Sequence, residues 1–146
     1  MKIESTAFKD NKLIPPKYTC DGEGVNPPLV ISDVPENAKS LVLIVDDPDA
    51  PRGTFVHWIV WNISPHIKEI PENICPQNSV EGMTDSGRSG YCAPCPPYGT
   101  HRYFFKLFAL NTTLDLDTSV KAADIEKEIE ENILVKTQLV GLYRRQ

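Results

Sequence analysis

Two of the three histidines stand in strongly apolar segments, and this placement indicates a functional site. His57 lies near the beginning of one such segment, and His101 begins another, with Tyr103 two residues further on. Side chains two residues apart on a strand point to the same face of a sheet. We therefore expect His101 to share a face with Tyr103, and His57 to share a face with Ile59 and Trp61.

A cluster of acidic residues and prolines follows the aliphatic segment 41–45. Its order is Asp46-Asp47-Pro48-Asp49-Ala50-Pro51. Such a cluster forms a rigid turn that ends a strand, and its carboxylates can simply accept hydrogen bonds from the backbone of the turn. A carboxylate can also fix the tautomer and orientation of a histidine ring. On this second interpretation, Asp47 joins His57, His101 and Tyr103 in one polar group.

The same group could serve an enzyme, and this alternative stays open. Asp47, His57 and His101 are suited to acid–base catalysis, whereas a hydrolase that forms a covalent intermediate also needs a nucleophile beside the base. Ser86 and Ser89 are the serines of the nearby loop, but the residues around Ser89 lack the pattern of a nucleophile elbow. A small hydrolase or other acid–base enzyme is therefore the alternative to a binding protein.

The four cysteines allow three interpretations. The Cys92-x-x-Cys95 spacing occurs in thiol oxidoreductases, but a low thiol pKa usually needs a helix N-terminus, and prolines follow here instead. A zinc site would combine Cys92 and Cys95 with two of Cys20, Cys75 and His101, although a lone pair with this spacing is weak support. Because no secretory signal is present, we expect reduced thiols in a chain that folds without disulfides or metal.

The elements that must position these residues follow from the prolines. All 13 lie at or before Pro97, and frequent prolines interrupt helices by removing backbone donors. The first two thirds of the chain are therefore predicted to form strands and loops. Short apolar segments bounded by turn residues are typical of strands, and they cover residues 29–32, 40–45, 55–63, 102–110 and 136–144.

One amphipathic helix is predicted over residues 120–134. Ile125, Ile129 and Ile133 recur at every fourth position with acidic residues between them, which is the spacing of a single buried helical stripe. Thr118 or Ser119 is a suitable N-cap.

The region 64–99 is rich in proline, glycine and serine, and no strong element is predicted there. A structureless loop of this length is usually functional. Prolines fix its backbone, and glycines allow close approach to a ligand, so it could present backbone N–H groups to an anion.

The composition excludes several classes of protein. The 146 residues include 15 basic and 20 acidic side chains, for a net charge of −5, which argues against nucleic acid as a partner because that binding needs clustered Lys and Arg. No apolar run approaches the ~18 residues of a membrane-spanning helix. No apolar signal segment follows the first residues. We therefore expect no membrane insertion and a cytoplasmic location.

Several segments together resemble one known family. They are Ile14-Pro15-Pro16-Lys17-Tyr18-Thr19-Cys20-Asp21-Gly22, Asn26-Pro27-Pro28-Leu29, Asp47-Pro48-Asp49-Ala50-Pro51, Val56-His57-Trp58 with Asn62, Pro94-Cys95-Pro96-Pro97, and Gly99-Thr100-His101-Arg102-Tyr103-Phe104-Phe105. Over nearly its whole length the chain resembles the short bacterial and archaeal branch of the phosphatidylethanolamine-binding protein family, also called Raf-kinase-inhibitor-like. The resemblance implies one domain over residues 1–146 and a mostly β fold. That fold has a β-sandwich-like core, a small second sheet and an amphipathic helix near the C-terminus.

The resemblance also implies a function. It indicates a non-enzymatic binding protein with a small pocket for phosphate or phosphoethanolamine-like head groups, and with no cofactor or metal. The pocket residues carried over are Asp47, Pro51, His57, Cys95, Pro96, His101 and Tyr103. Family members modulate kinases, proteases and signalling complexes, so the resemblance implies a kinase or protease as protein partner. The short microbial members of the family are homodimers, so the resemblance also implies a homodimer.

Two further expectations concern the pocket itself. The family loop usually carries glycines where this chain has Cys92 and Ala93, so a left-handed backbone at Ala93 would be strained. Protonation of an imidazole would give charge-assisted hydrogen bonds to a phosphate. We expect weak binding, with dissociation constants between about micromolar and about millimolar, that strengthens as the pH falls toward about 6.

Overall fold

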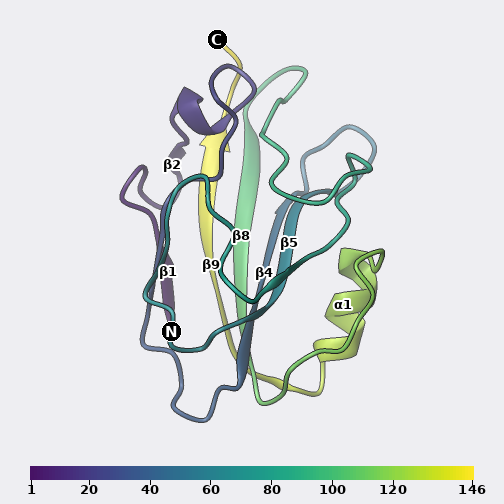
Figure 1. Cartoon of the computed structure of the whole chain (residues 1–146). Coiled ribbons are helices and arrows are strands. Elements are labelled where there is room, and N and C mark those ends of the chain that lie inside the picture. The colour runs from purple at the N-terminus through teal and green to yellow at the C-terminus, as the bar shows by residue number, and fades with distance from the viewer.

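The computed structural model describes residues 1–146 as two β-sheets and one α-helix (Figure 1). The strands are β1 (Lys2–Glu4), β2 (Lys12–Leu13), β3 (Leu29–Ser32), β4 (Ser40–Asp47), β5 (Phe55–Ile63), β6 (Glu69–Ile70), β7 (Val80–Glu81), β8 (His101–Leu110) and β9 (Ile133–Tyr143). A 3₁₀ turn, η1 (Pro16–Tyr18), follows β2, and the helix α1 (Ala122–Ile129) connects β8 to β9. The larger sheet has the order β2-β9-β8-β4-β5-β7, and the smaller has the order β1-β3-β6.

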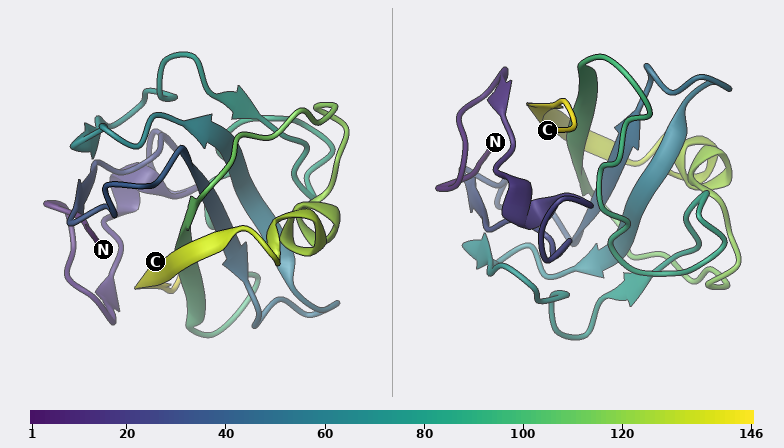
Figure 2. Two further views of the ribbon diagram at one scale, coloured as in Figure 1. Left: turned by 90° about the horizontal axis from the view of Figure 1, so that it is seen from below. Right: turned by 90° about the horizontal axis from the view of Figure 1, so that it is seen from above.

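The central strand β4 is buried on both faces. Its residues Leu41, Leu43 and Val45 face the small sheet, and the alternate residues Val42 and Ile44 face α1. Figure 2 shows the small sheet and α1 on opposite sides of the large sheet. The structure therefore confirms a mostly β, sandwich-like fold with a small second sheet and one helix near the C-terminus.

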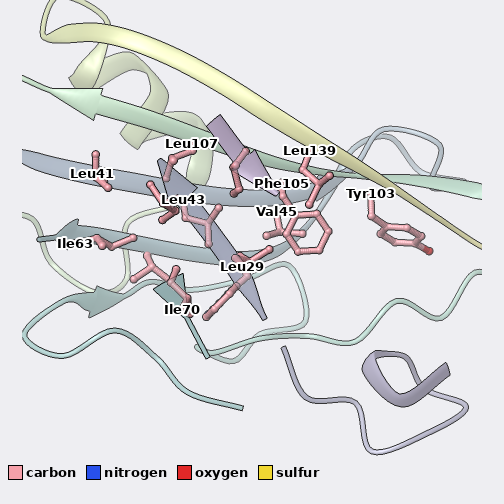
Figure 3. Packing of buried hydrophobic residues seen from close by; sticks show 14 of the residues in the cluster. Leu29, Leu41, Leu43, Val45, Ile63, Ile70, Tyr103, Phe105, Leu107 and Leu139 are labelled. Carbon is pink, nitrogen blue, oxygen red and sulfur yellow. The ribbon is translucent and has the colours of Figure 1, made fainter. Parts of the chain in front are cut away.

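The main core fills the space between the two sheets (Figure 3). Leu29 and Ile70 from the small sheet pack against Leu43, Phe105 and Leu107 of the large sheet, and all five are fully buried. Burying a side chain of this size contributes about 1.5–3 kcal/mol. This packing fixes the positions of β4, β5 and β8, whose ends carry the predicted site residues.

The five predicted strands are all present, whereas β1 and β2 were not predicted from the sequence. The segments 29–32 and 55–63 are β3 and β5, while β4 continues to Asp47 and β8 begins one residue earlier, at His101. In the region 64–99, where no strong element was predicted, the structure has only β6 and β7, each two residues long. These short strands extend the edges of the two sheets.

The helix is shorter than predicted. Ile125 and Ile129 are buried as their spacing indicates, but the helix ends at Ile129, and Ile133 begins β9 instead of continuing the stripe. Ile133 pairs with Leu110 of β8. Its branched side chain suits a strand as well as a helix, and here the pairing with β8 places it in the strand. The N-cap is Lys121, not Thr118 or Ser119. No helix in the structure has the length and apolar character needed to cross a membrane.

Two of the four cysteines are joined, which corrects the expectation of reduced thiols and of a fold without disulfides. Cys20 and Cys95 form a disulfide across 75 residues of sequence, with their Cα atoms 5.4 Å apart. The backbone N–H of Cys20 also donates to the carbonyl of Pro94 at 3.1 Å. Cys75 and Cys92 are free.

Reduction of this disulfide is expected to destabilise the protein. Closing a loop of 75 residues restricts the unfolded chain, and the chain-entropy relation gives a stabilisation of about 4 kcal/mol. Urea unfolding with and without dithiothreitol measures the effect. The double variant Cys20→Ala/Cys95→Ala is the control, because it should already be less stable and should not respond to the reductant. An equal free energy of unfolding for the oxidised and reduced wild-type protein would contradict this prediction.

Candidate functional site

The predicted polar group is assembled at one end of the large sheet. Asp47 ends β4, His57 lies near the start of β5, and His101 and Tyr103 lie at the start of β8. Because β4 pairs antiparallel with both β5 and β8, the end of β4 meets the starts of its two neighbours. All four side chains line a cavity of about 190 Å³, which is smaller than the ~300–1,000 Å³ typical of sites for drug-sized ligands.

The other predicted residues complete the walls of this cavity. Pro51, Cys95 and Pro96 line it as expected. The remaining lining residues were not predicted from the sequence; they are Ala50, Phe55, Cys92, Ala93 and Pro97. The cavity is therefore largely apolar, with a few polar groups at defined positions.

A β-bulge turns His57 toward the cavity. Val45 pairs with Trp58 but Asp46 pairs with Val56, so His57 is the extra residue on β5. The bulge breaks the alternation on which the prediction for His57 depended. Ile59 and Trp61 face α1, whereas His57 contacts Tyr103 in an edge-to-face arrangement with ring centroids 5.2 Å apart. The prediction that His57 shares a face with Ile59 and Trp61 is therefore wrong.

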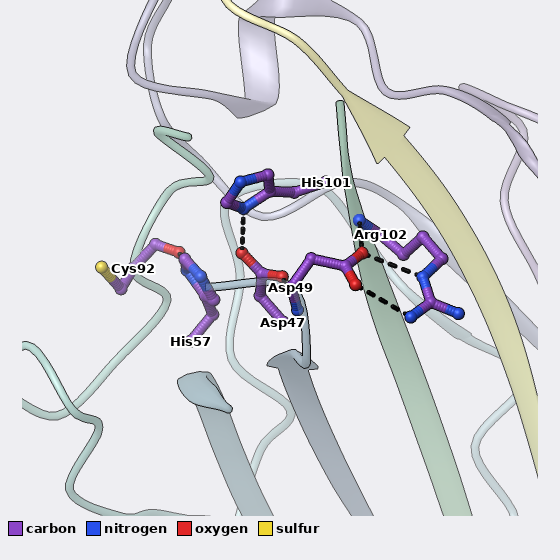
Figure 4. A network of polar contacts seen from close by, with 6 residues as sticks. All are labelled: Asp47, Asp49, His57, Cys92, His101 and Arg102. Atoms are coloured by element: carbon purple, nitrogen blue, oxygen red, sulfur yellow. Dashed lines mark hydrogen bonds and ion pairs between the residues drawn. The ribbon is translucent and has the colours of Figure 1, made fainter. Parts of the chain in front are cut away.

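His101 and Asp47 form a buried pair (Figure 4). The Nδ1 atom of His101 donates to Oδ2 of Asp47 at 2.7 Å, and the other carboxylate oxygen of Asp47 accepts the backbone N–H of Asp49 at 2.8 Å. Both residues are at most 5% exposed. Asp47 therefore fixes the orientation of the His101 ring, as one interpretation of the sequence proposed, while also closing the turn, as the other proposed.

His57 is held by the loop opposite to it. Its Nδ1 lies 2.8 Å from the carbonyl oxygen of Cys92, and the backbone N–H of Cys92 donates to the carbonyl of His57 at 2.8 Å. A carbonyl oxygen can only accept, so Nδ1 of His57 carries the hydrogen. Burial outweighs the favourable hydrogen bond and nearby carboxylates, and it lowers the pKa of His57 below its usual 6.5.

Tyr103 supplies a neutral hydroxyl to the site. Burial, together with the negative charge of Asp47, raises the pKa of Tyr103 well above its usual value, so the group remains a hydrogen-bond donor at neutral pH. Its ring also stacks on His101 with centroids 6.5 Å apart. Figure 3 shows this ring at the end of the core, with the hydroxyl pointing away from the aliphatic residues.

An ion pair beside the site fixes the turn between β4 and β5. Both oxygens of Asp49 accept from Arg102: Oδ1 from Nη2 at 2.8 Å, and Oδ2 from Nε at 2.9 Å and from the backbone N–H at 3.0 Å. These hydrogen bonds lower the pKa of Asp49 to about 2. Arg102 is thereby occupied, and no Lys or Arg side chain lines the cavity.

The remaining wall is the loop that carries the disulfide. Cys95 is bonded to Cys20, so it cannot form the Cys92–Cys95 pair that the oxidoreductase interpretation requires. For the same reason Cys95 is not available as a thiolate ligand for the zinc site considered above. Burial raises the pKa of the Cys92 thiol, and Figure 4 shows its sulfur pointing away from His57. Ala93 has no positive φ; the left-handed positions of this loop are Gly90 and Gly99, so the expected strain does not arise.

The fold and site identify a class of protein. The model of the phosphatidylethanolamine-binding protein family matches residues 4–144, which is nearly the whole chain. The protein therefore belongs to the phosphatidylethanolamine-binding protein family, and the resemblance noted in the sequence is confirmed.

Particular relatives agree with this assignment. The chain is 47% identical to a UPF0098 protein of Methanothermobacter thermautotrophicus, with 99% of each chain covered. It is 52% identical to a UPF0098 protein of Pyrococcus abyssi, with 97% of this chain and 84% of the relative covered. A crystal structure from Chlamydia trachomatis, described as a phosphatidylethanolamine-binding protein homolog, superposes with a TM-score of 0.95 at 40% identity, covering 99% of this chain and 97% of the other.

The lowered pKa of His57 predicts a pH dependence of stability. As the pH falls, the unfolded chain, in which the pKa of this histidine is near 6.5, takes up a proton at a higher pH than the folded chain does. The free energy of unfolding should therefore fall as the pH drops below about 6.5. The His57→Gln variant lacks this contribution. Urea unfolding of both proteins between about pH 7.5 and about pH 5.5 should give a steeper loss for the wild type. Equal losses over this range would contradict the prediction.

Proposed function

We propose that this protein is a non-enzymatic binding protein whose pocket holds phosphate or a phosphoethanolamine-like head group. The observation that carries the proposal is the convergence of two unpartnered ring nitrogens in one small cavity. His57 and His101 are 6% and 5% exposed, and each uses Nδ1 for a protein acceptor. Neither Nε2 has a protein partner, and neither is fully enclosed, so both are open to the cavity that the two rings line.

The charge of the site supports an anion that binds weakly and in a pH-dependent manner. No Lys or Arg lines the cavity, and therefore positive charge enters it only by protonation of a histidine. A protonated His101 would form an ion pair with Asp47 at 2.7 Å and donate a charge-assisted hydrogen bond from Nε2, which is roughly twice as strong as a neutral one. The Tyr103 hydroxyl, which also lines the cavity, adds a further polar group to the site.

The thiols give little support to an enzymatic function. The raised pKa of Cys92 keeps its thiol protonated, and a thiol needs to ionise to act as a nucleophile. The acid–base alternative, in which Asp47, His57 and His101 act as catalysts, predicts hydrolase activity that depends on these residues. The binding function predicts anion binding, and the experiments below distinguish the two. The kinase or protease partner and the homodimer implied by the family resemblance stay predictions. The cytoplasmic location, which was expected from the lack of an apolar signal segment, also stays a prediction.

An amide NMR titration tests the proposed binding. Phosphate and O-phosphoethanolamine should each cause saturable shifts at Asp47, at His57 and over residues 99–103, with a dissociation constant between about micromolar and about millimolar. Chloride and ethanolamine should not. The affinity should rise as the pH is lowered from about 8 toward about 6, beyond what the titration of the ligand itself explains.

The His101→Ala variant shows whether the ring carries the binding. Loss of one charge-assisted hydrogen bond should weaken phosphate binding at least about tenfold, while the His66→Ala variant, changed in a loop away from the cavity, should bind as the wild type does. If the wild-type protein shows no shifts at millimolar phosphate, the binding function is wrong. A screen for hydrolase activity that depends on His57 and His101 would then test the acid–base alternative.

A further inference from the structure

One wall of the cavity is attached to the rest of the protein mainly through Cys20. The wall is formed by residues 93–100, and it makes a single backbone hydrogen bond, from the N–H of Cys20 to the carbonyl of Pro94 at 3.1 Å. Three of its residues are prolines, which have no N–H to donate. The disulfide from Cys95 to Cys20 is the one covalent link from this segment to a distant part of the chain. Both attachments therefore end at the same residue.

The same segment supplies much of the cavity surface. Ala93, Cys95, Pro96 and Pro97 are four of the twelve lining residues. The residues on either side of the segment are held independently, Cys92 by its two hydrogen bonds with His57 at 2.8 Å and His101 by its place in β8. Without the disulfide, the segment can swing between these fixed ends and carry its four lining residues with it.

Cys20 lies on a firmly held part of the protein. Thr19 beside it is fully buried, and the Thr19 hydroxyl donates to the carbonyl of Pro16 at 2.9 Å. On the other side, Asp21 accepts a hydrogen bond from the hydroxyl of Tyr143 at 2.5 Å, which connects it to β9. The disulfide therefore holds a weakly attached wall against a well-fixed segment.

The disulfide is accessible to a reductant. Cys20 and Cys95 are both exposed, and exposed disulfides are more easily reduced than buried ones. The free thiols of Cys75 and Cys92 do not compete for it, because burial raises the pKa of each and only a thiolate attacks a disulfide. The bond therefore persists without an external thiol and is open to attack when one is present.

We propose, on the basis of the binding function above, that the Cys20–Cys95 disulfide is a redox modification site through which a dithiol reductant controls the cavity. One thiolate of the reductant attacks a sulfur of the disulfide, the sulfur–sulfur bond breaks, and the released cysteine thiolate takes up a proton. The second thiol of the reductant then displaces the other cysteine and forms the reductant's own disulfide. Two cysteine thiols are gained, and the reductant is oxidised by two electrons.

Reduction should weaken the binding of phosphate. The oxidised wall is already in place, whereas the reduced wall has to be ordered when the anion binds, and fixing even a few residues is costly. The dissociation constant of inorganic phosphate should therefore rise at least about tenfold on reduction. Calorimetry of the full chain with inorganic phosphate, before and after treatment with dithiothreitol, measures the change. Re-oxidation should restore the original affinity.

The Cys20→Ser variant isolates the contribution of the disulfide. Cys20 does not line the cavity, so the variant removes the bond and leaves every lining side chain in place. It should bind phosphate as weakly as the reduced wild type does, and dithiothreitol should cause no further loss. The matched control, Cys75→Ser, changes a free cysteine away from the cavity and should respond to the reductant as the wild type does.

Amide NMR without ligand distinguishes a local change from unfolding. On reduction, the signals of residues 91–99 and of His57 should move, while those of β4 should keep their native positions. Loss of the native β4 signals would overturn the proposal, because the disulfide would then hold the whole fold together and not this wall alone.

The binding results separate this proposal from the binding function. Saturable phosphate binding that is equally tight or tighter in the reduced protein would overturn the redox control and leave the binding function standing. Absence of phosphate binding by the oxidised protein would overturn the binding function, and the redox control of binding with it.

Discussion

The hydrogen bonds from Nδ1 of His57 and His101 to buried acceptors decide what this site can do. A ring nitrogen that is bonded inside the protein cannot also serve a ligand, so only the two Nε2 atoms are available. Since no Lys or Arg lines the cavity, those atoms determine its charge and its hydrogen-bonding pattern. The two acceptors differ, because the partner of His57 is a peptide carbonyl and the partner of His101 is a carboxylate.

The rest of the molecule holds these hydrogen bonds in place. Burial of β4 on both faces fixes the ends of the strands that carry Asp47, His57 and His101. The bulge at His57 turns that ring from the helix side to the cavity side, where the carbonyl of Cys92 meets it. The loop that supplies this carbonyl is in turn attached to the N-terminal segment by the disulfide between Cys20 and Cys95. A local change in any of these parts would alter the tautomer or the position of a cavity nitrogen.

The sequence predicted the five longer strands, the helix near the C-terminus and seven of the residues that line the pocket, because prolines, apolar segments and family motifs are local signals. It could not predict the orientation of His57, since a bulge depends on the pairing between two strands and not on the pattern within one. The end of the helix was misjudged because Ile133 suits both a helical stripe and a strand, and only the ladder with β8 decides between them. The disulfide was missed because reduced thiols were expected from the absence of a signal segment, and because Cys20 and Cys95 are 75 residues apart in sequence.

The central claim is that a protonated His101 and a neutral His57 together hold a phosphate-type anion. Nitrogen-15 spectra of the imidazole rings, recorded at neutral pH with saturating phosphate, measure this directly. The account predicts that His101 carries hydrogen on both ring nitrogens in the complex, while His57 keeps a single hydrogen on Nδ1. Spectra in which neither ring responds to phosphate, or in which His57 becomes the doubly protonated ring, would contradict it.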